Sequence, residues 1–222
     1  MSTSSFIKRS TLHLYPANNA KREKGLVRKQ APAFTAPTVL PNGTIATKSL
    51  SDYAGQWVIL LFYPLDFTFV CPTELLAFSD AYDKFKALGA EVLGVSCDSE
   101  YSHLAWANMP RKQGGLGPNF KLPLVADRSM HLAKEYGCLI EGEGHPLRAT
   151  YIIGPEGTVR SLTINDTPVG RSVDETIRLL EAFQFSDKHG EVCPANFKAS
   201  ERKTGLIPDP VKAKEYFEKT NA

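Results

Sequence analysis

The distribution of apolar residues predicts several short strands. The run WVILLFY at 57–63 is apolar without interruption, which is typical of a strand buried on both faces of a sheet. EVLGVSC at 91–97 predicts a second strand, and LPLVAD at 122–127 predicts a third. Later in the chain, ATYII and TVRSLTI flank a turn from Gly154 to Gly157, and this arrangement predicts a hairpin.

Segments with helical periodicity separate the predicted strands. Apolar residues recur at intervals of three and four from Leu75 to Phe85, which predicts an amphipathic helix that ends near Gly89. The other predicted helices occupy 101–117 with a break at Pro110, then 129–137, then 172–185, and finally a short segment that opens at Asp209 and Pro210.

The order of these elements indicates the fold class. Strands that alternate with helices predict a sheet covered on both faces, and the late hairpin adds antiparallel strands. We therefore expect an α/β protein, a thioredoxin-like sandwich with a mixed central sheet. From Gly190 onward the sequence turns polar and contains prolines, which predicts a C-terminal extension arm. The expected organisation is a leader at 1–30, a thioredoxin-like domain at 31–189 and the arm at 190–222.

Composition and charge exclude several classes of protein. Of the 222 residues, 42% are hydrophobic, which is enough to form a core. The formal net charge is only +2, so nucleic acid is not the expected partner. No apolar run approaches the about 20 residues that a membrane-spanning helix needs, so no membrane partner is expected either.

The charge is nevertheless unevenly distributed along the chain. Residues 1–30 contain seven Lys and Arg but a single acid, Glu23, and the other 192 residues carry a net charge of −4. This leader is serine-rich and lacks the continuous apolar core of a secretory signal. It resembles an organelle transit peptide, and a disordered basic arm is an equal alternative. We expect a cytoplasmic protein, or a mitochondrial one if the leader is a transit peptide.

Four cysteines occur, and no two of them are spaced C-x-x-C. A zinc site and a secreted disulfide scaffold are therefore not expected, and a reducing compartment fits the pattern better. Cys97 ends a predicted interior strand and Cys138 follows a predicted helix end, so neither receives a catalytic role. In a reducing compartment a lone thiol is a candidate nucleophile.

Cys71 lies where a strand pattern changes into a helix pattern, in YPLDFTFVCPTELLAF at 63–78. We expect Pro72 to occupy the first helical position, where its missing N–H costs little. A thiol at this place faces unpaired backbone N–H groups and the positive end of the helix dipole, which both favour the thiolate. A buried structural cysteine is the simpler alternative, but it does not explain why the proline and a nearby hydroxyl accompany this junction.

The segment around Cys71 closely resembles the active-site segment of the peroxiredoxins, and specifically that of the typical 2-Cys group. The family pattern Pro-x-x-x-Thr-x-x-Cys falls on Pro64, Thr68 and Cys71. Further segments resemble the same group in the same order, so that the resemblance covers nearly all of 31–222; they are SLSDYAGQWV, HLAWANMPRKQGGLG, NDTPVGRSVDETIRLLEAFQFSDKHGEVCPA and KEYF.

This resemblance implies a thiol peroxidase that reduces hydrogen peroxide and organic hydroperoxides without a metal, flavin or haem. Cys71 would be the peroxidatic cysteine, whose thiolate attacks a peroxide oxygen and becomes a sulfenic acid. Thr68 would donate or accept a hydrogen bond at the peroxide, and Pro64 would shield the pocket from water. Arg148 matches the arginine that stabilises the thiolate and holds the peroxide oxygens.

The assignment of Arg148 depends on the resemblance. By spacing alone it is a surface residue of a strand, and residues 143–149 depart from the usual family sequence around this arginine. Glu74 and Arg171 match residues that orient the catalytic arginine through charge-assisted hydrogen bonds. Without the resemblance, Glu74 would be a first-turn carboxylate favoured by the helix dipole.

Cys193 in the C-terminal arm matches the resolving cysteine. The resemblance implies that it comes from the partner subunit and condenses with the sulfenic acid of Cys71 to an intersubunit disulfide. A homodimer follows, and a decamer of five dimers is usual in the group. The helix turn that carries Cys71 would have to unwind first. Thioredoxin or a similar dithiol protein would then reduce the disulfide by exchange.

Two further segments match elements that the family associates with slow unfolding of the active site, namely GGLG at 114–117 and the pair Tyr216 and Phe217. A tail helix packed over the first turn would delay resolution, so that a second peroxide could oxidise the sulfenic acid to sulfinic acid. We therefore expect sensitivity to hyperoxidation. Ordinary packing of a terminal helix is the alternative role of the Tyr216–Phe217 pair.

Two other functions compete with peroxidase activity. A thioredoxin-like disulfide oxidoreductase would need C-x-x-C, but the position three residues after Cys71 is Glu74. A ring-shaped holdase chaperone is the second alternative, and it is compatible with peroxidase activity. A Cys71→Ser variant separates the two activities, because it should lose peroxide consumption but keep any chaperone activity.

Overall fold

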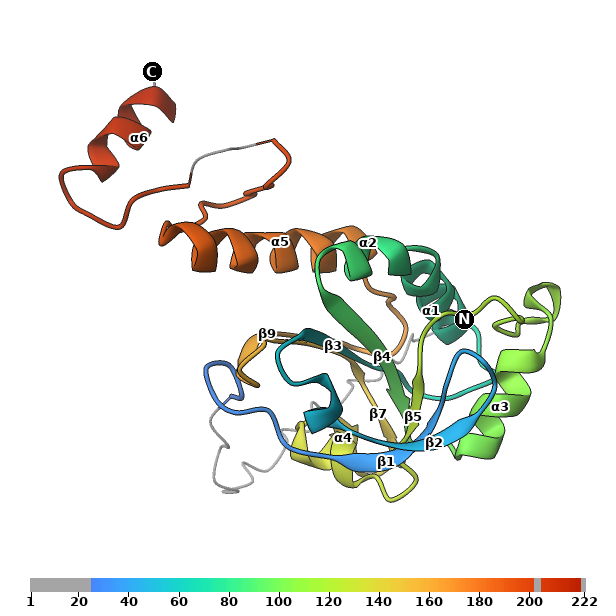
Figure 1. The fold of residues 1–222 in the computed structure, drawn as a ribbon. Coiled ribbons are helices and arrows are strands. Elements are labelled where there is room, and N and C mark those ends of the chain that lie inside the picture. The colour runs from blue at the N-terminus through green and yellow to red at the C-terminus, as the bar shows by residue number, and fades with distance from the viewer. Residues whose placement is uncertain (1–24, 202–204, 221–222) are drawn as a thin grey trace, which may run out of the picture.

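A seven-stranded mixed sheet forms the centre of the molecule (Figure 1). The structure is a computed structural model that describes residues 25–201 and 205–220. The strands lie in the order β2-β1-β5-β4-β3-β8-β9, and β6 and β7 form a separate two-stranded sheet. The strand bounds are Thr35–Val39 (β1), Ile45–Ser49 (β2), Trp57–Phe62 (β3), Ala90–Ser96 (β4), Leu124–Ala126 (β5), Leu139–Ile140 (β6), His145–Pro146 (β7), Arg148–Ile153 (β8) and Val159–Asn165 (β9).

The three central strands are parallel, and the outer strands are antiparallel to their neighbours. β4 pairs in parallel with both β3 and β5, whereas β8 pairs antiparallel with β3 and β9 pairs antiparallel with β8. Every residue of β3 and β4 is buried, as their apolar runs predicted. The expected α/β fold with a mixed central sheet is thereby confirmed.

Helices cover both faces of the sheet. Residues 57, 59 and 61 of β3 face a core that includes side chains of α1, α2, α3 and α5, whereas residues 58, 60 and 62 face a core shared with α4. None of the helices within the described residues is long and apolar enough to span a membrane. The helix bounds are Val70–Asp80 (α1), Tyr82–Ala87 (α2), Glu100–Asn108 (α3), His131–Glu135 (α4), Val173–His189 (α5) and Ala213–Thr220 (α6), with short 3-10 turns at Leu50–Tyr53 (η1) and Arg111–Gln113 (η2).

The first predicted helix differs from the structure in two respects. It is divided into α1 and α2 at Ala81, where ψ is 3° and the chain leaves helical geometry. It also begins at Val70, so the prediction that Pro72 occupies the first helical position is wrong. Pro72 is the third helical residue, where an N–H would still lack an intrahelical acceptor. Cys71 is therefore the second helical residue.

The hairpin of β1 and β2 was not predicted from the sequence. This segment is rich in proline, and β1 and β2 are only partly buried, so it lacks the apolar run that identified β3. Pro37 is accommodated because β1 pairs with β5 only through Thr38 and Val39. At the N-terminal end, Arg28 donates a backbone hydrogen bond to Val159 of β9, so contacts with the sheet begin before residue 31.

The C-terminal arm follows α5 and extends beyond its end, away from the sheet (Figure 1). The arm folds back on itself through a β-bridge between Val192 and Leu206 and then forms α6. In Figure 1, α6 lies far from α1, so the tail helix does not cover the first turn of α1 within its own chain. The leader residues 1–24 and the segment 202–204 lie outside the described residues.

Candidate active site

Cys71 is completely buried at the start of α1. The strand β3 ends at Phe62, and a loop of seven residues then leads into the helix. Phe69 occupies the N-cap position of α1, and no side chain caps the helix there. The backbone N–H groups of the first turn therefore lack a side-chain acceptor, and Cys71 lies at the positive end of the helix dipole.

Arg148 is the residue that brings positive charge to the sulfur of Cys71. Its Nη1 lies 3.4 Å from Cys71 Sγ, and the arginine is only 4% exposed. Arg148 opens β8, and the antiparallel register that pairs Ala149 with Phe62 brings it to the end of β3 from which α1 follows. The Nε atom donates a hydrogen bond of 2.6 Å to the carbonyl of Thr167, which fixes the plane of the guanidinium.

Glu74 binds both arginines that the family resemblance singled out. Its Oε2 accepts hydrogen bonds from Arg148 Nη1 at 2.6 Å and from Arg171 Nη2 at 3.0 Å. Its Oε1 accepts from the backbone N and the Nε of Arg171, both at 2.8 Å. One buried carboxylate thus orients two guanidinium groups, and the three charges leave a net positive charge beside Cys71.

The ionisation of Glu74 follows from these contacts. Burial raises the pKa of this carboxyl. The hydrogen bonds and charge of Arg171 and the charge of Arg148 lower the pKa by more than burial raises it, so that the net shift is downward. Glu74 is therefore ionised at neutral pH. Arg171 is also held by the Ala149 carbonyl at 2.8 Å, which ties the carboxylate to β8.

The two remaining residues of the motif lie in the loop between β3 and α1. Pro64 is buried directly after Tyr63, at the end of the buried run. Thr68 is half-buried, and its hydroxyl donates a hydrogen bond of 3.0 Å to the carbonyl of Leu65. The oxygen of Thr68 therefore retains a lone pair that can accept a hydrogen bond.

A buried polar cluster that was not predicted from the sequence anchors this loop. Asp66 accepts hydrogen bonds from Tyr63 Oη at 2.8 Å and from Ser102 Oγ at 2.7 Å, and it contacts His103 Nδ1 at 2.9 Å. Its backbone N–H donates to the carboxylate of Asp98 at 2.9 Å. His103 is fully buried. The one feature of the sequence that could have indicated this cluster is that Asp66 lies within the segment around Cys71.

Cys193 lies apart from Cys71 in this single chain. It is half-buried in the arm, and its Sγ donates a hydrogen bond of 3.4 Å to the carbonyl of Ala182 on α5. Burial raises the pKa of this thiol, Arg178 opposes the shift, and Glu191 adds to it. All four cysteines are free in this single chain.

The other two cysteines are buried among core side chains. Burial raises the pKa of Cys97 and of Cys138 to about 12 in each case, so both thiols stay protonated and unreactive at neutral pH. Within the described residues, no three His, Cys, Asp or Glu side chains form a group that could hold a metal ion.

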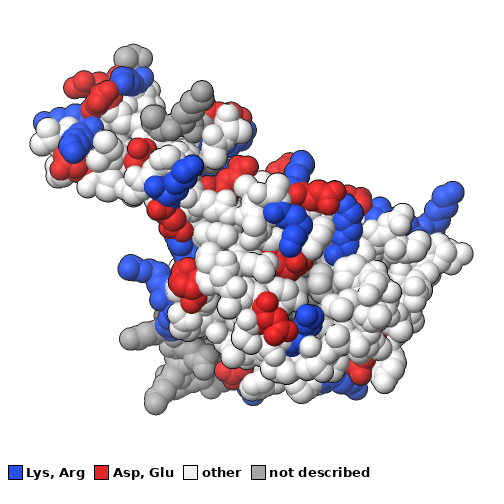
Figure 2. All heavy atoms as spheres, viewed as in Figure 1, with Lys and Arg blue, Asp and Glu red and all other residues white. Residues whose placement is uncertain are grey.

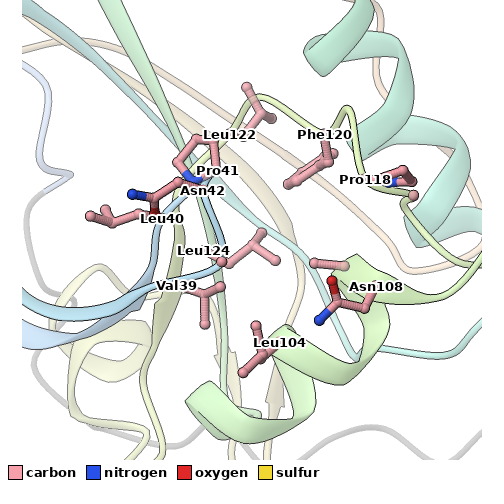
Figure 3. Close-up of a pocket in the computed structure, with 13 residues that line it drawn as sticks. Val39, Leu40, Pro41, Asn42, Leu104, Asn108, Pro118, Phe120, Leu122 and Leu124 are labelled. Carbon is pink, nitrogen blue, oxygen red and sulfur yellow. The ribbon is translucent and has the colours of Figure 1, made fainter.

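Other surface features lie away from these residues. A cavity of about 300 Å³ opens between the β1–β2 turn, the end of α3 and the loop before β5, and apolar side chains such as Leu104 and Phe120 line most of it (Figure 3). Pro64, Thr68 and Cys71 do not border it, whereas Gly117 of the GGLG segment does. Figure 2 shows charges of both signs interspersed on the visible face, without a large area of one sign.

Comparison with known proteins identifies the family. The model of the AhpC/TSA family matches residues 27–162, and the model of the C-terminal domain of 1-Cys peroxiredoxin matches residues 182–219. The chain belongs to the peroxiredoxins of the AhpC/TSA family. It is 55% identical to peroxiredoxin-1 of Gallus gallus over 88% of this chain and 97% of that protein. It is 49% identical to peroxiredoxin-4 of Rattus norvegicus over 89% of this chain and 71% of that protein.

Solved structures of peroxiredoxins share this fold. The reduced 2-Cys peroxiredoxin of Plasmodium vivax superposes with a TM-score of 0.84 at 39% identity, covering 88% of this chain and 100% of that one. The mitochondrial 2-Cys peroxiredoxin of Plasmodium falciparum gives a TM-score of 0.72 at 44% identity, covering 76% and 100%. The predicted family and thioredoxin-like fold are confirmed, and the protein is a thiol peroxidase.

Proposed function

We propose that this peroxiredoxin reduces hydrogen peroxide and organic hydroperoxides through a sulfenic acid at Cys71. The observation that carries the proposal is the contact of 3.4 Å between Arg148 Nη1 and Cys71 Sγ, made by a guanidinium that Glu74 holds at 2.6 Å. A fixed cation beside a sulfur at a helix start provides what a nucleophilic thiolate needs.

In the first step the Cys71 thiolate attacks one oxygen of the peroxide. A sulfur–oxygen bond forms, the O–O bond breaks, and the departing oxygen takes up a proton and leaves as water or an alcohol. Arg148 stabilises the negative charge that develops on the departing oxygen, because its guanidinium is already oriented by Glu74.

Thr68 and Pro64 prepare the peroxide for this attack. The single hydroxyl proton of Thr68 is donated to Leu65, so Thr68 acts on the peroxide by accepting its O–H hydrogen bond. That hydrogen bond holds the attacked oxygen in line with the sulfur. Buried Pro64 limits the access of water to the same place.

In the second step Cys193 of the partner subunit attacks the sulfur of the sulfenic acid. Because Cys71 is fully buried, the first turn of α1 must unwind before the two sulfurs can meet. The uncapped start of the helix supports this step, because its first turn lacks the stabilisation that a side-chain cap supplies. Thioredoxin or a similar dithiol protein then reduces the intersubunit disulfide by exchange.

A homodimer is required by this scheme, and we propose that dimers assemble further into a decamer. β9 lies at the edge of the sheet and pairs only with β8 among the described strands, so a second copy can extend the sheet there. The exposed apolar side chains of the loop before α1, Leu65, Phe67 and the 91% exposed Phe69, offer a second contact between copies. Sedimentation of a Phe69→Asp variant tests this proposal. We expect the variant to lose the decamer and to keep the dimer.

We also propose that the enzyme is sensitive to hyperoxidation. The GGLG loop at 114–117 is tightly packed, since a Cβ on Gly115 would lie 2.1 Å from the carbonyl oxygen of Met109 and Leu116 is fully buried. Because α6 lies far from α1 in its own chain, the tail helix that delays unfolding must come from a partner subunit. Truncation after Lys214 that leaves peroxide inactivation unchanged would disprove this proposal.

For the cellular location, we propose a reducing compartment. Four cysteines in a chain of 222 residues do not form the dense pattern of a secreted disulfide scaffold, which supports a reducing compartment. We propose the cytoplasm, or the mitochondrion if residues 1–30 direct import, with the thioredoxin-like domain at 31–189 and the arm at 190–222 retained in either case. N-terminal sequencing of native protein from fractionated cells decides between them.

The proposed chemistry is tested by non-reducing electrophoresis after one equivalent of hydrogen peroxide. We expect a covalent dimer for the wild type and for a Cys97→Ser control, because Cys97 is a buried, protonated thiol. We expect no covalent dimer for Cys193→Ser or for Cys71→Ser. A dimer band that persists in Cys193→Ser would contradict the assignment of the resolving thiol.

A further inference from the structure

The part of the arm that contains Cys193 is anchored to α5 by a buried aromatic side chain. Phe197, four residues after Cys193, is completely buried, and its ring centroid lies 4.9 Å from that of Phe185 on α5. The chain reaches this position through a tight turn in which Phe197 N donates to the carbonyl of Pro194, with Asn196 at a positive φ of 58°. A fully buried aromatic side chain on an extended arm indicates a specific docking contact.

Arg178 of α5 holds the same turn by its backbone. Its Nη1 donates a hydrogen bond of 3.0 Å to the carbonyl of Phe197. Its Nε and Nη2 bind the two carboxylate oxygens of Glu175 at 2.6 and 2.7 Å, so the guanidinium is oriented before it meets the arm. Hydrogen bonds from a charged donor in such a bidentate arrangement are among the stronger ones in proteins.

These contacts keep Cys193 on its own α5. The Cys193 Sγ donates to the Ala182 carbonyl at 3.4 Å, and Ser186 Oγ donates to the Glu191 carbonyl at 2.7 Å just before it. In the proposed second step the thiol leaves this place to reach the sulfur of Cys71 in another subunit. The contacts made by Phe197 and Arg178 lie directly after Cys193 and therefore oppose that movement.

We propose that Phe197 and Arg178 form a latch that holds the resolving Cys193 against α5 of its own chain, and that opening of this latch precedes disulfide formation. The inference rests on the proposed function, because it concerns the second step of that reaction. Once the latch is open, the Cys193 thiolate attacks the sulfur of the sulfenic acid on Cys71 of the partner subunit. The sulfur–sulfur bond forms, the sulfur–oxygen bond breaks, and the departing hydroxide takes up a proton and leaves as water.

The latch has a consequence for damage by peroxide. While Cys193 is held against α5, the sulfenic acid on the partner's Cys71 is not converted to the disulfide and can react with a second peroxide. The latch therefore acts in the same direction as slow unwinding of α1, but it is built from residues of the arm and α5. Phe197 and Arg178 are positioning residues, since neither contacts the reacting atoms.

Two variants open the latch without removing the positive charge next to Cys193. Arg178→Lys keeps the charge but cannot bind Glu175 with two nitrogens and also reach the Phe197 carbonyl. Phe197→Ala removes the buried aromatic ring and leaves Arg178 in place. A matched control is Arg160→Lys, because Arg160 also binds a carboxylate with two nitrogens, Nη1 and Nη2 on Asp187 of α5 at 2.8 Å each, but makes no hydrogen bond to the arm in the described residues.

The test is rapid mixing with one equivalent of hydrogen peroxide, followed by acid quenching and quantification of sulfenic acid and disulfide. We expect the first phase, peroxide consumption, to be unchanged in both latch variants. We expect the second phase, disulfide formation, to be faster in both variants, and by about tenfold in Arg178→Lys, the factor that corresponds to one hydrogen bond from a charged donor. The Arg160→Lys control should match the wild type in both phases.

A merely structural role of the two residues would give the opposite result, because a disordered arm would present Cys193 less often and slow the second phase. Unchanged or slower disulfide formation in the latch variants, with a normal wild type, overturns this inference alone. A wild type that forms no disulfide overturns the proposed function and this inference with it.

Hydrogen exchange in the reduced, peroxide-free protein gives an independent readout of the latch. Backbone amides of 193–201 should exchange faster in Arg178→Lys and Phe197→Ala than in the wild type, whereas those of α1 should be unchanged. Equal exchange of 193–201 in all variants would show that the two residues do not hold the arm, whatever the peroxidase assay gives.

Discussion

Arg148 Nη1 lies between Cys71 Sγ at 3.4 Å and Glu74 Oε2 at 2.6 Å, so one nitrogen links the candidate nucleophile to a buried carboxylate. The guanidinium is held in place before any peroxide arrives. It therefore costs little reorganisation when negative charge develops on the departing oxygen. This arrangement leads to predictions for each of its members.

Replacement of Arg148 should impair the first step. We expect Arg148→Lys to lower the second-order rate constant for peroxide by about 100-fold, because a point charge cannot replace the oriented donors of the guanidinium. Stopped-flow measurement of peroxide consumption by the reduced enzyme gives this rate constant. Arg160→Lys serves as the control and should react at the wild-type rate, since Arg160 binds Asp187 on α5. A wild-type rate in Arg148→Lys would contradict the role assigned to it.

Glu74 should make the stability of the enzyme depend on pH. The pKa of Glu74 is lowered in the folded state from its ordinary value of 4.5, so its stabilisation is present above that value and is lost as the pH falls through the folded-state pKa. At pH 7 we expect Glu74→Gln to unfold with a free energy about 3 kcal/mol lower than the wild type, because two buried guanidinium groups lose their carboxylate.

Urea unfolding of the wild type and of Glu74→Gln across the acid range measures this dependence. The difference between the two proteins should be largest near neutral pH and should shrink below pH 4.5. A difference that stays constant across the same range would show that the ionised carboxylate is not the source of the stabilisation.

Thr68 should act through its oxygen. We expect Thr68→Val to slow the reaction with peroxide by about tenfold or more, because the peroxide O–H loses its hydrogen-bond acceptor. Thr68→Ser keeps the hydroxyl and should retain most of the activity. Stopped-flow kinetics of the two variants side by side makes the comparison, and equal rates for Val and Ser would remove Thr68 from the mechanism.

Cys97 and Cys138 should be inert in the folded protein. Because burial raises the pKa of both thiols to about 12, iodoacetamide at pH 7.5, read out by peptide mass spectrometry, should label neither of them within the time that labels half-buried Cys193. Unfolding in urea should make all four cysteines react. Rapid labelling of Cys97 in the native protein would contradict the packing described here.

Patterns along the sequence predicted the centre of the fold but not its margins. The uninterrupted apolar run of β3 identified a buried strand, because burial on both faces leaves no polar position. β1 was missed because its exposed positions and Pro37 hide the pattern. The break at Ala81 has no sequence signal, since the apolar periodicity continues across it.

The residues of the site likewise include some that the sequence predicted and some that it did not. The motif located Cys71, but only the fold brings Arg148 to it, 77 residues away. The resemblance to a family supplied that partner, whereas spacing alone favoured a surface residue. Asp66 and His103 were missed because their contact joins the loop before α1 to helix α3, 37 residues later in the sequence. The latch at Phe197 was likewise invisible, because a single aromatic residue in a polar arm gives no periodic signal.

The most direct test of the account concerns the sulfur of Cys71. Reduced Cys193→Ser protein is mixed with one equivalent of hydrogen peroxide in the presence of dimedone, and peptide mass spectrometry locates the product. We predict consumption of the peroxide and a dimedone adduct on Cys71 alone. An adduct on Cys97 or Cys138, or peroxide that remains unconsumed while Cys71 stays a free thiol, would contradict the central claim.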